Sequence, residues 1–555
     1  MIHGVFREGQ EQADVPKLER LQTLGHRGSH PGAGIRLLVV ALALILASCG
    51  GETTAEPPEE PAAAPTTSPL AATSTSAPAA ETTSTAASPT ETITTTPAVT
   101  TTSRAESAAD TIPAEEVDAV SMVSSEGYTF PPPPDFPDGG ISVQLRHDLN
   151  AFFDIVESER RFAHMELLSF TNHDDIRVAW VLADILRFAN SLELIEVIGA
   201  RLRQMLGEEG IAGDPIDLWK RVTNLLIAWD LPAFPDYPKF KKRLFVLVEP
   251  GWEPFFNDPD ATIDWRWVSW GGVFIDNRPL GAGVPCPRGC IPSLDDPAVT
   301  PASEGDWYPD DRVVFGVTIN GESRAYPKHQ MEIHEMVNDT LGGRRIGMPY
   351  CTLCGSAQAY FTDGVPEGIE VPVLRTSGLL SRSNKVMYDL NTSSVFDTFT
   401  GEAVSGPLRE AGIRLDQATV VSSTWGAWKE AHPDTTILAE DGGLGRSYPF
   451  DPLRGRDDQG PIFPVGDVDT RLGVQDLVVG VELEDGRTVA FSREAALAVI
   501  DSGGEVTAEG VRLIKDGDGL RAISVSDGSE IPSHQAFWFA WSQFRPNTRL
   551  WSSPG

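Results

Sequence analysis

Two cysteines three positions apart, Cys351 and Cys354, are the residues of this chain whose types and spacing best fit a chemical role. The chain holds 5 Cys in 555 residues, so a pair this close stands out. A Cys-x-x-Cys pair serves as a redox-active disulfide, as half of a metal site or as a structural disulfide. We expect the pair to lie at the end of a strand, and the pattern leaves these three roles open.

A second pair, Cys286 and Cys290, adds further alternatives. The two pairs together could form a four-thiolate zinc site, which would be structural. His334 beside one of the thiolates would instead suit copper, because soft metals bind both sulfur and imidazole. In an oxidising compartment, two local disulfides, 286–290 and 351–354, would account for the same four residues. Thiol–disulfide exchange at Cys351 and Cys354 is a further alternative, and free thiols are the last.

Other polar residues in this part of the chain could line a ligand pocket without any reactive cysteine. A zinc-protease motif would need a second His four residues after His334, and position 338 is Asn. The sequence also contains no Gly-x-Ser-x-Gly elbow, which argues against a serine hydrolase. The catalytic residues are therefore open, and so is the question of whether the protein is an enzyme. The pocket hypothesis rests on His334, Asn338, Ser377, Arg382 and Tyr388.

The N-terminal segment is typical of an exported lipoprotein. Leu37 to Ala47 is an uncharged apolar run that follows Arg36. It is shorter than the ~20 residues that cross a bilayer, and it fits the apolar region of a secretion signal. Leu46 to Cys49 resembles a bacterial lipobox, in which the cysteine receives lipid. We therefore predict a signal peptide over residues 1–49, a lipid anchor at Cys49 and an extracytoplasmic location at the cell membrane.

Residues 50–125 consist mainly of Thr, Ala, Ser, Pro and Glu, with almost no large apolar side chains. Such a composition cannot offset the conformational entropy of folding, so we predict a disordered stalk. The net charge of −35 argues against binding to nucleic acid, which requires clustered Lys and Arg. The predicted partners are the membrane, through the anchor, and a further protein.

Apolar residues recur at helical spacing between residues 126 and 262. One such segment follows Asn172–Asp175, the next ends at Gly207, and a third begins at Asp214, which suits an N-cap. A fourth helix is expected over Lys239–Val248. Short amphipathic helices with brief loops resemble a HEAT-like array, so we predict a scaffold or a surface for a protein partner.

From residue 263 to 555 the pattern changes to short strands, and it repeats. Val313–Tyr326 parallels Leu477–Phe491, and both read as hairpins with an Asn-Gly or Asp-Gly turn. Thr424–Thr435 likewise parallels Phe537–Thr548, each reading as a helix with an aromatic face that ends near Pro. We infer two copies, at about 310–440 and 475–552. The predicted fold class is α+β multidomain: an N-terminal helical, HEAT-like domain followed by a β-rich, internally duplicated domain.

Several long motifs in this half resemble the bacterial family known as domain of unknown function 3179, over roughly residues 265–555. They are His334–Gly343, Tyr350–Ala357, Ser377–Leu380, Met387–Asp389, Gly401–Ala403, Gly406–Leu408 and Trp425–Thr435. The resemblance implies an exported or membrane-associated protein with a duplicated β-rich domain and no assigned activity. The chain departs from the family pattern in three places: Thr352 stands where Pro is usual, Arg382 and Asn384 stand where Asn and Asp are usual, and Phe396 stands where Trp is usual.

Two functions follow as hypotheses. The first is a membrane-anchored lipoprotein that binds a metal ion or a protein, with a Cys/His site for the ion or a structural disulfide. The second is an envelope thiol–disulfide redox enzyme that uses Cys351 and Cys354.

Overall fold

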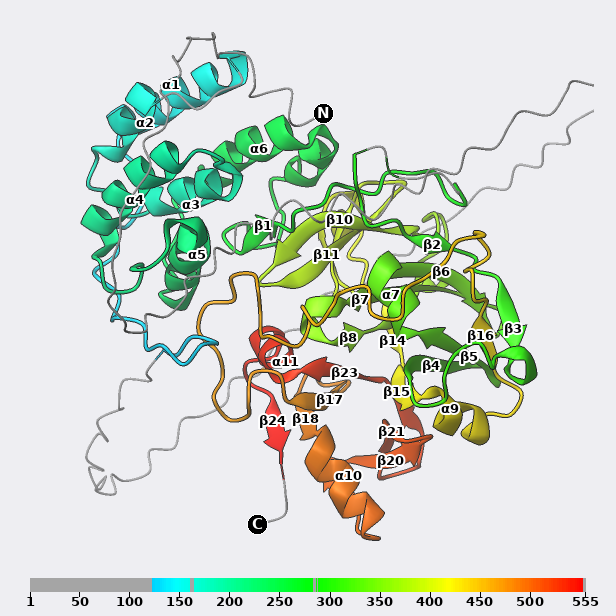
Figure 1. Cartoon of the computed structure of the whole chain (residues 1–555). Coiled ribbons are helices and arrows are strands. Elements are labelled where there is room, and N and C mark those ends of the chain that lie inside the picture. The colour runs from blue at the N-terminus through cyan, green and yellow to red at the C-terminus, as the bar shows by residue number, and fades with distance from the viewer. Residues whose placement is uncertain (1–121, 160–163, 283–285, 287, 553–555) are drawn as a thin grey trace, which may run out of the picture. The chain divides into compact units, whose positions relative to one another are not determined.

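The computed structural model describes residues 122–159, 164–282, 286 and 288–552 (Figure 1). The predicted signal peptide, Cys49 and nearly all of the predicted stalk lie outside these ranges. Within them, no helix is both long and apolar enough to cross a membrane. The described residues combine helices with several β-sheets, so the α+β class is confirmed at that level.

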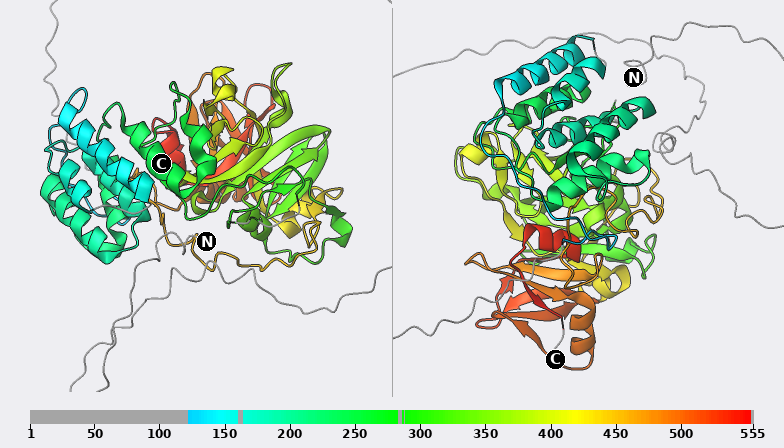
Figure 2. Two further views of the ribbon diagram at one scale, coloured as in Figure 1. Left: turned by 90° about the horizontal axis from the view of Figure 1, so that it is seen from above. Right: turned by 90° about the vertical axis from the view of Figure 1, so that its left-hand side faces the viewer.

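In the part of the chain that the structure describes, six α-helices come first. They lie next to one another in Figures 1 and 2. Ser191 begins α4 by accepting a hydrogen bond from the Leu194 amide, and Gly207 follows its last turn with φ of 82°. The predicted cap at Asp214 precedes a short 3-10 turn, Pro215–Asp217, rather than the α-helix itself. The helices are α1 Val143–Glu159, α2 His164–Thr171, α3 Val178–Phe188, α4 Leu192–Leu206, α5 Leu218–Ala228 and α6 Tyr237–Val248.

The helices share one hydrophobic core with the β-sheet whose first strand begins at Val268. Val268, Leu379 and Tyr388 of that sheet belong to the same cluster of buried side chains as the helical core. The indole N–H of Trp252 also donates to the Ser377 carbonyl across this contact, at 2.7 Å.

Two sheets surround the cysteine pair. The first is antiparallel, in the order β1 Val268–Trp270, β10 Leu374–Ser381, β11 Asn384–Asp389, β12 Val395–Asp397 and β13 Ala403–Ser405. The second has the order β14 Asp416–Ala418, β9 Ala359–Phe361, β7 Arg344–Cys351, β6 Met336–Leu341 and β2 Leu294–Asp295, and β8 Ser356–Ala357 also pairs with β7. Helix α7, Lys328–His334, leads into β6.

Two further sheets have the same connectivity. In each, a central hairpin has an antiparallel neighbour on one side and a parallel strand on the other. The first is β15 Val421–Thr424, β4 Val313–Ile319, β5 Glu322–Pro327 and β16 Thr436–Leu438, extended by β3 Val299–Pro301. The second is β23 Ser533–Phe537, β17 Leu477–Glu482, β18 Thr488–Ser492 and β24 Arg549–Trp551.

The same side-chain contacts hold a helix against each of these sheets. Trp428 of α9 (Trp425–Ala431) covers Gly316, where a Cβ would meet the ring at 2.4 Å. Trp541 of α11 (Trp538–Phe544) covers Gly480 in the same way, at 2.1 Å. Only glycine leaves room for an indole this close to a strand.

The remaining elements complete the C-terminal part, which is coloured orange to red in Figure 2. Helix α10, Arg493–Asp501, follows β18, and a fifth sheet has the order β19 Val506–Ala508, β20 Val511–Asp516, β21 Gly519–Ser524 and β22 Glu530–Ile531. Helix α8, Pro407–Glu410, follows β13.

Candidate functional site

Cys351 is the last residue of β7, and Cys354 closes a 3-10 turn directly after it. Gly355 then adopts a left-handed conformation (φ 58°), which suits a residue without Cβ, and the chain returns as β8 beside β7. The two sulfur atoms face each other at 2.9 Å as free thiols. Both side chains are buried, with relative exposures of 3% for Cys351 and 0% for Cys354.

A tight turn between β10 and β11, formed by Arg382 and Ser383, covers the thiols. The Ser383 carbonyl lies 3.6 Å from the Cys351 sulfur and 3.5 Å from the Cys354 sulfur. Both turn residues have positive φ, 46° for Arg382 and 71° for Ser383. Each such conformation costs a residue with a Cβ roughly 1–2 kcal/mol, and strain of this kind gathers where the surrounding structure holds the chain in place.

A buried ion pair lies beside the dithiol. The Lys385 ammonium is 2.8 Å from a Glu335 carboxylate oxygen, and it also donates to the Glu335 carbonyl at 2.6 Å. Glu335 itself ends α7 in a left-handed conformation with φ of 50°. The pair therefore places one positive and one negative charge next to the start of the Cys-x-x-Cys segment.

This surrounding separates the pKa values of the two thiols. Burial alone would raise the pKa of Cys351, and the nearby Glu335 charge acts in the same direction. The hydrogen bond with Cys354, the Lys385 amide and the Lys385 ammonium outweigh both, so the pKa of Cys351 lies below its ordinary value. Burial, and then the contact with Cys351, raise the pKa of Cys354 well above its ordinary value. Of the two thiols, Cys351 is thus the more acidic and Cys354 the less acidic.

The C-terminal part of the chain supplies the wall on the other side. Cys351 and Cys354 belong to one buried cluster with Phe399 and with side chains of β17, β23 and α11, among them Ala536 and Trp538. A Cβ on Gly355 would lie 2.9 Å from the ring of Phe537. Water is therefore excluded from this side of the dithiol.

Residues 288–510 match a family model described as "Protein of unknown function (DUF3179)". This part of the chain belongs to the DUF3179 family. The resemblance seen in the sequence is thereby confirmed, and the matched segment holds the dithiol, the Lys385–Glu335 pair and the Arg382–Ser383 turn. No curated protein and no solved structure matches the chain.

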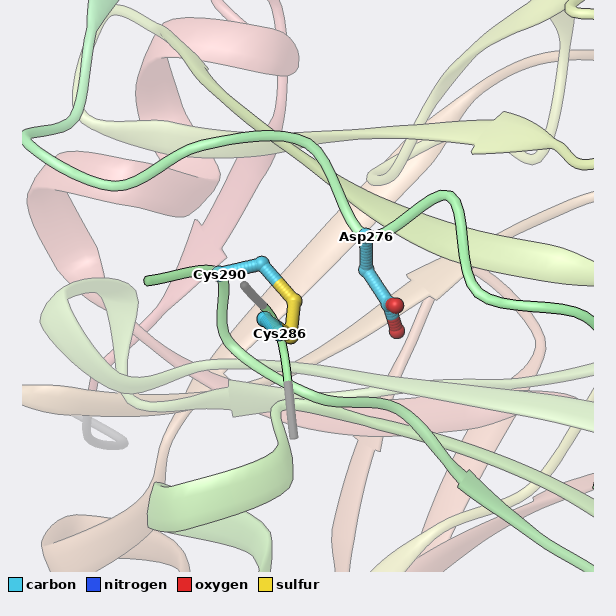
Figure 3. Close-up of side chains that lie close together, drawn as sticks. All are labelled: Asp276, Cys286 and Cys290. Atoms are coloured by element: carbon cyan, nitrogen blue, oxygen red, sulfur yellow. A yellow bond between two sulfur atoms is a disulfide. The ribbon is translucent and has the colours of Figure 1, made fainter. Parts of the chain in front are cut away.

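The second cysteine pair lies at the N-terminal boundary of the DUF3179 segment. Cys286 and Cys290 form a disulfide, with their Cα atoms 5.4 Å apart, and Asp276 lies beside them (Figure 3). Among the described residues, these three are the metal-ligand side chains found close together, and they do not include Cys351 or Cys354. The structure therefore does not bring the two cysteine pairs into one set of metal ligands.

The donor set around Asp276 does not fit a resident metal ion. Both sulfurs are bonded to each other. The Asp276 carboxylate already accepts hydrogen bonds from the Arg278 guanidinium at 2.6 and 2.9 Å and from the Ser293 amide at 2.8 Å. The disulfide borders a cavity of about 210 Å³, which Glu249, Asn277 and Arg288 also line.

His334 lies at the end of α7 and contacts neither sulfur. Its Nδ1 lies 2.6 Å from the Pro292 carbonyl oxygen, and its Nε2 lies 2.8 Å from the Tyr448 hydroxyl. Burial lowers the pKa of His334 to about 4, so the ring is neutral at pH 7. Both nitrogens are occupied by the fold, which leaves none for copper.

Three of the proposed pocket residues have structural hydrogen bonds. Asn338 donates to the Asp295 carboxylate and exchanges hydrogen bonds with the Leu374 backbone. Ser377 donates to a strand carbonyl within the same sheet, and the Tyr388 hydroxyl donates to the Asp276 carbonyl. Arg382 belongs to the turn that covers the dithiol, and its guanidinium stacks on Trp267, 3.9 Å from the centre of the ring.

Sequence reasoning missed Lys385 and Glu335 as partners of the dithiol. They are 50 positions apart along the chain, and their pairing depends on how β11 lies beside β7 and the end of α7. No local pattern indicates such a contact.

Proposed function

We propose that this chain is an exported, membrane-anchored protein whose DUF3179 segment carries a redox-active dithiol at Cys351 and Cys354. The observation that carries the proposal is the 2.9 Å contact between two free thiols with opposite pKa shifts, beside the buried Lys385 ammonium. A lysine in this position favours the thiolate, which is the reactive form in thiol–disulfide exchange.

The same geometry argues against the metal-binding alternative. A closed zinc site uses four Cys, His or carboxylate ligands, whereas two sulfurs meet here and His334 is engaged elsewhere. The ammonium of Lys385 would also repel a cation. A disulfide, in contrast, requires the sulfurs to approach from 2.9 Å to a bond length of about 2.05 Å.

The proposed exchange takes place in two steps. The Cys351 thiolate attacks one sulfur of a substrate disulfide, which forms a mixed disulfide and releases the first substrate thiolate. Cys354 then loses its proton and attacks the Cys351 sulfur, which releases the second thiolate and leaves a 351–354 disulfide. Two electrons pass to the substrate, and the two released thiolates take up the protons of the two cysteines. Because both cysteines are buried, the Arg382–Ser383 turn must shift to admit the substrate.

The compartment is part of the proposal. The Cys286–Cys290 disulfide suits an oxidising location outside the cytoplasm. The lipobox around Cys49 would supply the anchor, the tract over 50–125 would act as a stalk, and the helices over 126–262 would offer a HEAT-like surface to a protein partner.

The test is a redox titration of the purified protein. The protein is equilibrated with buffers of increasing ratio of oxidised to reduced glutathione, the free thiols are alkylated, and the mass of the peptide that spans 351–354 is measured. We expect a two-electron transition in the wild type and in a Cys286→Ser/Cys290→Ser control. Cys351→Ser should abolish it. A pair that stays fully reduced at every ratio, or one metal ion that remains bound to the pair through dialysis, would contradict the proposal.

A further inference from the structure

The second step of the proposed exchange requires a proton acceptor, because Cys354 attacks as a thiolate. Its thiol is fully buried, and burial raises its pKa well above the ordinary value. Two oxygen atoms of described residues lie at its sulfur, the Ser383 carbonyl at 3.5 Å and the Asn384 side-chain oxygen at 3.8 Å. Both are amide oxygens, which accept a hydrogen bond but do not keep a proton at neutral pH. The Cys351 sulfur is by then part of the mixed disulfide, so the proton must reach another group.

Glu335 is held against the Cys-x-x-Cys segment by hydrogen bonds from both neighbours of Cys351. The Tyr350 amide donates to the Glu335 carbonyl at 3.0 Å, and the Thr352 hydroxyl donates to the Glu335 carboxylate at 3.3 Å. Thr352 and Cys354 belong to the same 3-10 turn. A carboxylate therefore contacts the turn from which Cys354 attacks.

The surroundings of the carboxylate suit the transfer of a proton to water. The Lys385 ammonium binds Oε2 of Glu335 at 2.8 Å, and Oε1 accepts the hydrogen bond from Thr352. The negative charge of Glu335 also raises the pKa of both thiols, so it acts across the dithiol. The Glu335 side chain is 14% exposed, whereas Cys354 is 0% exposed. Glu335 thus contacts both the dithiol turn and the solvent.

We infer that the Glu335 carboxylate accepts the proton of Cys354 in the second step, with the Thr352 hydroxyl as the bridge. The inference rests on the proposed redox function and adds a proton acceptor to it. The hydroxyl takes the Cys354 proton and gives its own to the carboxylate, while the Cys354 thiolate attacks the Cys351 sulfur of the mixed disulfide. The bond from Cys351 to the substrate breaks, and the substrate leaves as a thiolate. Glu335 then gives its proton to water, and the released thiolate takes one up.

The experiment follows the two steps separately with dipyridyl disulfide, a neutral compound whose released thiol is measured by absorbance. The full chain carries Cys49→Ser, Cys286→Ser and Cys290→Ser, so Cys351 and Cys354 are its two thiols. This parent chain is reduced and mixed with an equal concentration of the disulfide. The first release reports the attack by Cys351, and the second reports the attack by Cys354.

Two variants separate the proton acceptor from the rest of the site. Glu335→Gln still offers Lys385 and Thr352 an acceptor but removes the base. It should slow the second release about a hundredfold, as expected for the loss of a general base, and should not slow the first. Thr352→Val keeps the shape of the side chain and every charge, so it carries the test if Glu335→Gln does not fold. It should slow the second release about tenfold, the loss expected for one hydrogen bond to a charged group.

Glu332→Gln is the matched control, because Glu332 is buried in α7 and also pairs with a lysine, Lys328. It removes the same charge, and both releases should match those of the parent chain. Equal slowing of the two releases in Glu335→Gln, or a second release as fast as the parent's in either Glu335→Gln or Thr352→Val, would overturn the inference and leave the redox function intact. A parent chain that gives no second release would overturn the redox function and the inference together.

Discussion

Replacement of Gly355 by alanine tests how the dithiol turn is held against the C-terminal part of the chain. Gly355 is left-handed (φ 58°, ψ 25°), a conformation that costs an L-residue roughly 1–2 kcal/mol. The new Cβ would lie 2.9 to 3.1 Å from three atoms of the Phe537 ring. Overpacking of this kind costs roughly 1–3 kcal/mol more. Gly355→Ala should therefore lower the free energy of unfolding by about 2–5 kcal/mol.

Gly343 provides a control with the same backbone requirement. It also has a positive φ, 75°, but a Cβ there would meet nothing within 4 Å. Gly343→Ala should therefore cost only the conformational part, about 1–2 kcal/mol. Urea unfolding of both variants gives the comparison, and the difference between them isolates the contact with Phe537. Because the turn must move to relieve that contact, alkylation of Cys351 and Cys354 should become faster in Gly355→Ala alone.

Equal destabilisation by the two substitutions, with equal alkylation rates, would refute this reasoning. Phe537→Ala adds a second check, because it removes the ring that the new Cβ would meet. In that background, Gly355→Ala should cost no more than Gly343→Ala does in the wild type. A persistent excess would mean that something other than Phe537 confines the turn.

Two further predictions concern protonation. Lys385→Met removes an ammonium that lowers the pKa of the Cys351 thiol, so the pH midpoint of Cys351 alkylation should rise. An unchanged midpoint would mean that the Lys385 amide and Cys354 suffice. Burial lowers the pKa of His534 to about 3, whereas its pKa in the unfolded chain is about 6.5. The contribution of the neutral ring to the free energy of unfolding is therefore fully present above about pH 6.5. It is lost as the pH falls towards 3, because the unfolded chain takes up the proton first. His534→Gln should therefore reduce the loss of stability between pH 7.5 and pH 5 by up to roughly 2 kcal/mol, measured as urea unfolding at both pH values.

Local turn chemistry made the hairpins predictable. The Asn320-Gly321 and Asp485-Gly486 turns were expected to join paired strands, and β4–β5 and β17–β18 do so. Asn320 and Gly321 both have positive φ, 50° and 82°, which is the backbone that these residue types favour. Signals of this kind depend on residues next to one another in the chain.

The surroundings of the dithiol depend on contacts between distant segments, and they could not be predicted. The Cys-x-x-Cys spacing identified the two thiols, but nothing near them indicates Lys385 or the turn at Ser383. For the pocket hypothesis, the sequence identified polar residues but could not show what they bind. Asn338, Ser377 and Tyr388 are polar residues on buried strands, and sequence does not distinguish a side chain that binds a ligand from one that bonds to the fold.

The two similar sheets explain why the dithiol is buried. The turn after β7, which holds the cysteines, packs against Phe537 at the end of β23. The turn between β20 and β21 makes the reciprocal contact with β15: Asp518 accepts hydrogen bonds from the Ser423 hydroxyl and the Thr424 amide at 2.7 Å.

The two turns differ in what they place at the contact. In the C-terminal part, an acid and two glycines, Asp518 between Gly517 and Gly519, lock the turn to the neighbouring strand by hydrogen bonds. At the turn after β7, the thiols of Cys351 and Cys354 pack against aromatic side chains that offer them no hydrogen bond and exclude water. A carboxylate in these apolar surroundings would lack hydrogen-bond partners. Thiols can be buried there, and the pKa values of the two thiols remain different. The C-terminal part therefore acts on the dithiol as the lining of its site.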